Sequence, residues 1–280
     1  MLACRARHWD DGVDRVVGEF VRGYRAALAD PRTTAPIPRI VQRIRAGFRS
    51  DPSMFFSWLD TIVEPIPEST DEALRAALQT YVDEMLAADP SLGREYFHIV
   101  SLARLHIGLG SARSLKYLAR VRGPSDSPDD DDVLEVKQVG DLSGIACLSR
   151  SVVGDPTRVI VGQARLAYSP FRLVGRVVLD GTHFWVHAWP RSYQELAVGE
   201  LESVNELAEV AFDAGVQLGL GHPKFMPTTP NPVRASTVRL LDSRRAELVD
   251  LSKAMADETI AAWKRFLQKS DARRPQARTR

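Results

Sequence analysis

A glycine-rich turn followed by a lysine on a strand-like segment is the clearest chemical signal in the sequence. Gly108 and Gly110 flank Leu109 and precede Ser111, and Lys137 stands later on a segment that alternates apolar and polar residues. Glycines lack a Cβ atom, so the backbone can come close to a phosphate or adopt a positive φ. An ammonium group can bind the same phosphates as a point charge. Together the two features indicate half of a nucleotide site.

Two other sets of polar residues have types that could bind a metal ion. Residues 129–132 are four consecutive aspartates, and His183 and His187 have a spacing that suits zinc. The aspartates end a polar connection that contains two prolines. Their like charges repel each other, so a solvated turn is favoured over a metal site. The two histidines have no acidic or cysteine third ligand nearby in the sequence. We therefore expect no metal site in this chain.

The composition is that of a folded protein with a full hydrophobic core. The chain has 280 residues, of which 44% are hydrophobic and 26% are charged, which suits one large domain or two lobes. Its 37 basic residues nearly balance its 36 acidic residues, for a net charge of +1. Such a balance provides no overall field for nucleic acid or an anionic membrane, so neither is expected as a partner.

The cysteines and the hydropathy pattern favour a cytoplasmic protein. Cys4 and Cys147 are far apart and offer neither a metal-ligand spacing nor a disulfide framework. A reduced cytosolic setting is the favoured interpretation, with a single long-range disulfide as the alternative. The N-terminal residues lack the apolar stretch of a signal peptide, and no run of apolar residues reaches the length of a membrane span.

The pattern of apolar residues changes twice along the chain. Residues 1–100 are predicted to be mainly helical, because apolar residues recur at helical spacing. Residues 101–190 are predicted to form a small lobe with a mostly antiparallel sheet of about five strands and one helix. Residues 191–268 read as helical again, and residues 269–280 as a disordered tail. The expected fold class is α+β.

Individual elements can be assigned within these regions. Asp180 and Gly181 stand between two strand-like runs and predict a hairpin. The expected helices cover residues 14–28, 39–48, 70–88, 156–168, 196–220 and 236–267. The expected strands include residues 115–121, 133–139, 173–179 and 183–189.

Four short segments together resemble a known family. They are Ile-Gly-Leu-Gly-Ser at 107–111, Leu-Glu-Val-Lys at 134–137, Arg-Val-Ile-Val-Gly-Gln at 158–163 and Phe-Trp-Val-His at 184–187. In order and approximate spacing they resemble the bacterial domain-of-unknown-function 2252 family. That family is similar to a circularly permuted protein kinase or aminoglycoside phosphotransferase. The resemblance extends over residues 6–220 and implies a two-lobed, kinase-like architecture.

The resemblance implies roles for five residues. Gly108, Gly110 and Ser111 would cover the phosphates of a nucleotide, and Lys137 would pair with them, as the kinase template requires. Gln163 could hydrogen-bond Lys137. ATP is the cofactor that this arrangement would take, and Lys137 should point toward the glycine turn.

The sequence also departs from the family pattern. Val161 stands where the family tends to carry a glutamate that would pair with the lysine. The early G-D-x-H-x-x-N and D-F-D segments, which carry the presumed base and Mg²⁺ ligands, have no counterpart. The resemblance therefore implies a truncated chain, with no catalytic residue to assign and no support for Mg²⁺ from this chain alone.

Three aromatic or imidazole side chains have both an ordinary and a functional interpretation. His222 resembles the histidine that closes the equivalent helix in phosphotransferases, but a histidine favoured by the helix dipole is the simpler interpretation. Trp185 and Trp189 are expected to be core and hinge residues, with contact to an adenine as the alternative.

Three functions are consistent with these observations. The first is half of a phosphotransferase, whose catalytic segment is supplied by another polypeptide or by sequence upstream of this start. The second is a non-catalytic module for nucleotide binding or scaffolding. The third is a degraded fragment with neither activity. Loss of a general base alone typically costs a factor of about 10²–10⁴ in rate, so we expect nucleotide binding without independent phosphotransfer.

Overall fold

A computed structural model describes residues 1–50, 53–106, 114–140, 156–190, 196–224 and 232–272. Its chain forms two compact units. The helical unit consists of Met1–Gln42 and Leu196–Arg280, and the sheet unit of Arg43–Glu195. The sheet predicted over residues 101–190 thus shares its unit with the helical residues that precede it.

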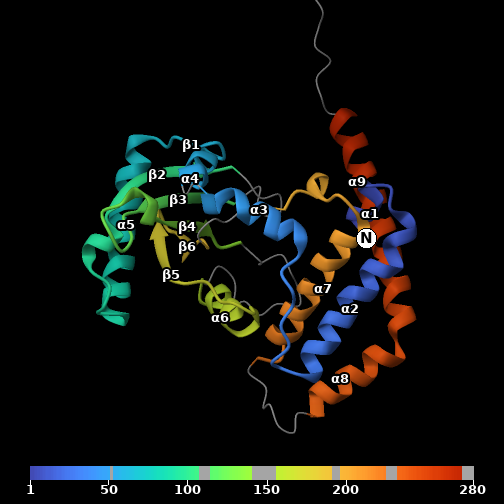
Figure 1. Ribbon diagram of the computed structural model, residues 1–280. Coiled ribbons are helices and arrows are strands. Elements are labelled where there is room, and N and C mark those ends of the chain that lie inside the picture. The colour runs from blue at the N-terminus through green and yellow to red at the C-terminus, as the bar shows by residue number, and fades with distance from the viewer. Residues whose placement is uncertain (51–52, 107–113, 141–155, 191–195, 225–231, 273–280) are drawn as a thin grey trace, which may run out of the picture. The chain divides into compact units, whose positions relative to one another are not determined.

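The helical unit is built around two long helices, α2 (Val13–Ala29) and α7 (Val204–Gly221). They lie side by side (Figure 1), and their backbones approach closely at Gly23 and Gly215. A Cβ atom at Gly215 would lie 2.1 Å from the carbonyl oxygen of Phe20, so a larger residue would push the helices apart. The other helices of this unit are α1 (Leu2–Ala6), α8 (Pro232–Ser243) and α9 (Arg245–Ala272), and α3 (Arg39–Ser50) begins in it.

The sheet unit contains one antiparallel sheet of six strands in the order β1-β2-β3-β4-β6-β5. The strands are β1 (Val63–Glu64), β2 (Ile99–Leu105), β3 (Lys116–Val121), β4 (Asp132–Gln138), β5 (Gly175–Leu179) and β6 (Thr182–Ala188). Its helices are α4 (Ser53–Asp60), α5 (Glu68–Ala88) and α6 (Pro156–Leu166). The Asp-Gly hairpin between β5 and β6 is confirmed: Asp180 and Gly181 both have positive φ, at 49° and 73°.

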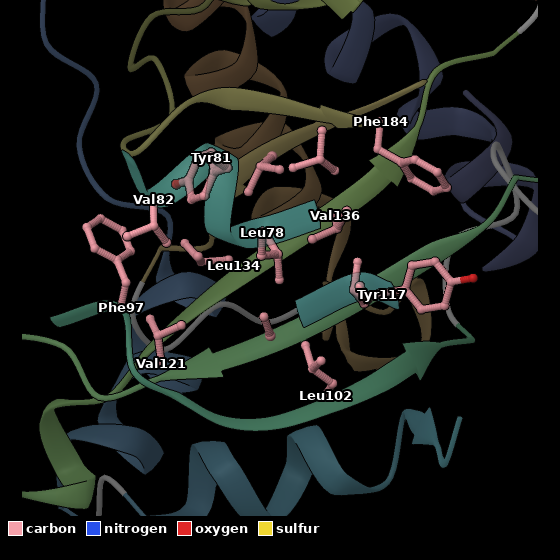
Figure 2. Packing of buried hydrophobic residues seen from close by; sticks show 14 of the residues in the cluster. Leu78, Tyr81, Val82, Phe97, Leu102, Tyr117, Val121, Leu134, Val136 and Phe184 are labelled. Carbon is pink, nitrogen blue, oxygen red and sulfur yellow. The ribbon is translucent and has the colours of Figure 1, made fainter. Parts of the chain in front are cut away.

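Each face of the sheet buries its own apolar cluster. On one face, Leu134 and Val136 of β4 pack with Leu78 and Tyr81 of α5 and with Phe184 of β6 (Figure 2). The opposite face holds a smaller cluster, to which β4 contributes Val133 and α4 contributes two residues, Phe55 and Leu59. Because side chains alternate along a strand, β4 presents residues 132, 134 and 136 to one face and 133, 135 and 137 to the other.

The mixed α and β composition is confirmed, but several details differ from the expectation, among them the start of α7 at Val204 instead of residue 196 and the three that follow. The sheet has six strands instead of about five, because β1 is only two residues long and such a strand leaves no periodic pattern. The helix expected over 236–267 is two helices that separate at Arg244, where the Ser243 hydroxyl donates to the carbonyl of Leu240. Helix α9 also extends to Ala272, beyond the expected start of the tail, because proline first interrupts the sequence at Pro275.

No helix in the part of the chain that the structure describes is long and apolar enough to cross a membrane.

Candidate functional site

Lys137 lies near the end of the central strand β4, between β3 and β6. Its Cα partners are Lys116 on β3 and Trp185 on β6, so these three side chains share one face of the sheet. The Lys137 side chain is 33% exposed, and its Nζ lies 3.9 Å from Oε1 of Glu135, two residues earlier on the same strand face. Lys137 is therefore held by a carboxylate but remains accessible to solvent.

Glu135 is a buried carboxylate with several donors around it. Its Oε2 accepts hydrogen bonds from Nε1 of Trp189 and, with the imidazole protonated at that nitrogen, from Nε2 of His187, each at 3.0 Å. Burial by itself would raise the pKa of Glu135, but the hydrogen bonds from His187 and Trp189 and the charge of Lys137 hold it below its ordinary value. Glu135 is consequently a fixed negative charge at neutral pH.

Aromatic stacking fixes the imidazole that donates to Glu135. The His187 ring lies 4.0 Å from the Phe171 ring and 4.2 Å from the Trp185 ring, measured between centroids, and it is 2% exposed. The backbone N–H of Phe171 donates to Oε1 of Gln163 at 3.0 Å, which ties the segment after α6 to that helix. The orientation of Glu135 is thus set by groups that cannot easily rotate.

Lys116 adds a second ammonium to the same face. It is buried at the first residue of β3, directly opposite Lys137 in the antiparallel ladder. Like charges directly opposite one another in a ladder destabilise it. Because Lys116 is buried and the Lys137 side chain is one-third exposed, Lys137 is the accessible cation of this pair.

The residues predicted from the sequence differ in how far the structure describes them. Gly108, Gly110 and Ser111 lie outside the described residues, so the orientation of Lys137 relative to the glycine turn stays a prediction. Lys137 lies on β4 as expected, and Gln163 bonds the backbone of Phe171 through its amide oxygen.

Glu135 is a partner of Lys137 that the sequence analysis did not identify. The resemblance placed the family's acidic partner at the helix position that Val161 occupies here, which is 39% exposed, and left Gln163 as the candidate to hydrogen-bond Lys137. The structure provides the carboxylate from β4 itself. The strand alternation around residues 133–139 contained this signal, because residues i and i+2 of a strand share a face.

The interpretation of residues 129–132 as a solvated turn is wrong for the last two aspartates. Asp131 and Asp132 are 6% and 1% exposed. Asp131 pairs with Arg120 at 2.5 Å, while Asp132 accepts from the Tyr96 hydroxyl and pairs with Arg172 at 3.3 Å. Burial and the neighbouring Asp132 raise the pKa of Tyr96 to about 12. Consecutive acidic residues can be buried when each carboxylate has a hydrogen-bond donor or a cation as a partner. The sequence of the aspartates alone does not reveal such partners.

The histidines and the described cysteine have ordinary surroundings. His183 is exposed, whereas His187 is committed to Glu135, and no group of three metal-binding side chains occurs among the described residues. His222 follows α7 and its Nδ1 lies 3.0 Å from the hydroxyl of Tyr24.

Cys4 is a buried free thiol whose pKa is raised by burial, and Cys147 lies outside the described residues. Trp185 and Trp189 are both buried, at 7% and 5% exposure.

Comparison with known proteins gives one result. No curated protein and no solved structure matches the chain. A family model matches residues 45–269, and its description is "Uncharacterized protein conserved in bacteria (DUF2252)". The match covers most of the 280 residues, including nearly all of the sheet unit. The chain therefore belongs to this family of uncharacterised bacterial proteins.

Proposed function

We propose that the sheet unit binds the phosphates of a nucleotide, with Lys137 as the principal contact, and does not transfer phosphate by itself. The observation that carries this proposal is the position of Lys137. Its side chain is one-third exposed and lies opposite a second lysine in the ladder, and its Nζ is 3.9 Å from a carboxylate that also accepts from two other donors. A phosphate oxygen at this edge would give the Lys137 ammonium a second anionic partner beside Glu135.

Chain connectivity supports the same proposal. Lys116, the first residue of β3, lies directly opposite Lys137, and by sequence it follows the connection from β2. By sequence this connection contains Gly108, Gly110 and Ser111. A glycine-containing connection and a strand lysine at one end of a sheet are the two parts of the kinase small lobe that contact ATP phosphates. The kinase-like and permuted character of the fold is part of this proposal.

The proposal of binding without turnover follows from the buried acids. Asp131, Asp132 and Glu135 each have a cationic or hydrogen-bonding partner, so none of them offers a carboxylate for a base or for Mg²⁺. A polypeptide that supplies the catalytic segment would be needed for phosphotransfer. The alternative is a scaffold module or a phosphotransferase fragment that binds no nucleotide.

Calorimetric titration with a non-hydrolysable ATP analogue distinguishes these functions. We expect Lys137→Ala to weaken binding at least tenfold, equivalent to about 1.4 kcal/mol. The matched control is Lys264→Ala, which removes the same charge from an exposed position of α9 and should leave the affinity unchanged. Saturable binding that survives Lys137→Ala would overturn the role of Lys137, and no binding by the wild-type chain would favour the scaffold alternative.

A turnover assay tests the second half of the proposal. With ATP and Mg²⁺, the purified chain should show no hydrolysis or transfer near the roughly 1–100 s⁻¹ of working kinases. Turnover in that range, abolished by Lys137→Ala, would show that a catalytic acid is present.

A further inference from the structure

The helical unit contains a pocket that the nucleotide proposal does not use. It has a volume of about 560 Å³ and lies between α2, α7 and the residues that lead into α3. This volume is in the range of pockets that hold small organic ligands. The residues that matter for the argument are Arg15, Arg22, Arg39, Ile37, Asn205 and Phe212.

Two of the three arginines that line the pocket are neutralised. Arg39 donates from Nε to Oε1 of Glu209 at 2.8 Å and from its backbone N–H to Oε2 at 3.0 Å. Arg22 donates from Nε to both carboxylate oxygens of Glu19, at 3.1 and 3.0 Å. These two acids are the carboxylates that line the pocket, and each is held by an arginine.

Arg15 is different, because its partner is a neutral amide. Its Nη1 donates to Oδ1 of Asn205 at 2.5 Å, and among the described residues no carboxylate pairs with it. The amide positions the guanidinium without cancelling its charge, and donors of the same group remain available for a second acceptor. The pocket therefore has a net positive charge that belongs to Arg15.

Most of the remaining wall is apolar, and part of it is stiff. Ile37 stands between Pro36 and Pro38 and is 48% exposed, although isoleucine is one of the residue types most often buried. Phe212 lies on the α7 side with the guanidinium of Arg22 stacked 4.1 Å from its ring centroid. The prolines restrict the backbone around Ile37, so the apolar wall is preformed.

We propose that this pocket binds a small organic anion that carries one carboxylate or phosphate group on an apolar body. The anionic group accepts hydrogen bonds from Arg15, for which a planar guanidinium is well suited. The apolar body lies against Ile37 and Phe212 and removes their surface from water. The site is independent of Lys137, which belongs to the other unit.

Binding of simple probes to the full chain tests this proposal by NMR titration. Benzoate and phenyl phosphate represent the two head groups, inorganic phosphate lacks the apolar body, and benzyl alcohol lacks the charge. At least one aromatic anion should bind with a Kd of about 1 mM, which is reasonable for so small a ligand. Inorganic phosphate and benzyl alcohol should bind at least tenfold more weakly. The stronger aromatic anion identifies the head group.

Three variants localise the binding. Arg15→Gln should weaken it at least fivefold, and Ile37→Ala about threefold, while the matched control Arg32→Gln should leave it unchanged. Arg32 is an exposed arginine whose side chain lies outside this pocket. The assay is repeated in the Lys137→Ala background, where the affinities should be the same. Equal binding by Arg15→Gln, equal binding of inorganic phosphate, or loss of binding with Lys137→Ala would each overturn the proposal.

Discussion

Strand β4 carries two buried carboxylates, and they are neutralised in different ways. Asp132 lies on the face that α5 covers, where the Tyr96 hydroxyl and the permanent charge of Arg172 meet it. Glu135 lies on the opposite face, where His187 and Trp189 donate to it and the ammonium of Lys137 lies at a longer 3.9 Å. Both acids avoid the cost of an isolated buried charge, which amounts to several kcal/mol.

The difference teaches where the fold leaves charge available. The guanidinium of Arg172 pairs with Asp132 at the start of β4 and stabilises that buried acid. At Glu135 the hydrogen bonds from His187 and Trp189 already satisfy much of the carboxylate, and Lys137 lies farther away, at 3.9 Å. A cation that is positioned but incompletely neutralised can bind a further anion. The two pairs therefore differ in how closely the cation is held: Nη2 of Arg172 donates to Asp132 at 3.3 and 3.4 Å, whereas Nζ of Lys137 lies 3.9 Å from Glu135.

Asp132→Ala is the largest expected perturbation and tests the structural side of the comparison. It leaves the Tyr96 hydroxyl and Arg172 without their acceptor, so the sheet unit should lose about 3 kcal/mol of stability. Hydrogen exchange of the β3, β4 and β6 amides measures this loss in the sheet unit itself. Asp129→Ala, in the same aspartate run but exposed, should change it by less than about 0.5 kcal/mol. Equal effects of the two substitutions would contradict a structural role for Asp132.

Glu135→Gln should have a smaller effect that depends on pH. At pH 7 the variant should lose about 2 kcal/mol, because hydrogen bonds to a charged acceptor are replaced by weaker ones. The pKa of Glu135 is lowered from 4.5 in the folded chain, so its contribution is fully present above that value and is lost as the pH falls below it.

The unfolding free energies of the wild type and Glu135→Gln should accordingly converge in acid. Urea unfolding between pH 7 and pH 3 measures the convergence. Glu95→Gln is the control, because Glu95 is 80% exposed and should show little difference at any pH. A constant gap between the wild type and Glu135→Gln would indicate that the hydrogen bonds, rather than the charge, stabilise this face.

Tyr96→Phe should have a still smaller effect, about 1 kcal/mol, because it removes one hydrogen bond and keeps the ring. The pKa of Tyr96 is raised from 10 to about 12, so its contribution is present below pH 10 and is lost as the pH rises through 12. The difference in tyrosinate absorbance between the wild type and the variant should show one group that titrates near pH 12. A difference curve centred near 10 would mean that the phenol is not held by Asp132.

The sequence predicted the regular elements well because their patterns are local. Helix α5 and strands β3 and β4 begin and end within about two residues of their expected bounds. The hairpin at Asp180 and Gly181 was predictable because only a few residue types tolerate positive φ at both turn positions. Such signals depend on neighbours in sequence and need no knowledge of the partner surface.

What the sequence could not predict depends on contacts between distant residues. The periodicity of α5 shows that the helix has an apolar face but not that this face covers the sheet. Because it does, α5 belongs to the same compact unit as the sheet. The burial of Asp132 depends on Tyr96 and Arg172, which are 36 and 40 residues away. The orientation of Glu135 depends on His187 of strand β6 and on Trp189, the residue that follows β6. Only a three-dimensional arrangement brings such partners together.

Gln163→Glu is the smallest perturbation and sharpens the functional side of the comparison. The carboxylate keeps an acceptor for the Phe171 N–H, so the tie after α6 remains and stability should change by less than about 0.5 kcal/mol. The substitution removes the amide donor and adds a negative charge on α6, a helix that packs against β6 beside the strand of Lys137. If Gln163 contributes to the phosphate site, affinity for the ATP analogue should fall about threefold or more, because the new charge repels the phosphates. The control Gln268→Glu adds the same charge to an exposed position of α9 and should have no effect. Unchanged affinity in Gln163→Glu would restrict this residue to holding Phe171 against His187, and Lys137 would remain the described contact for the nucleotide.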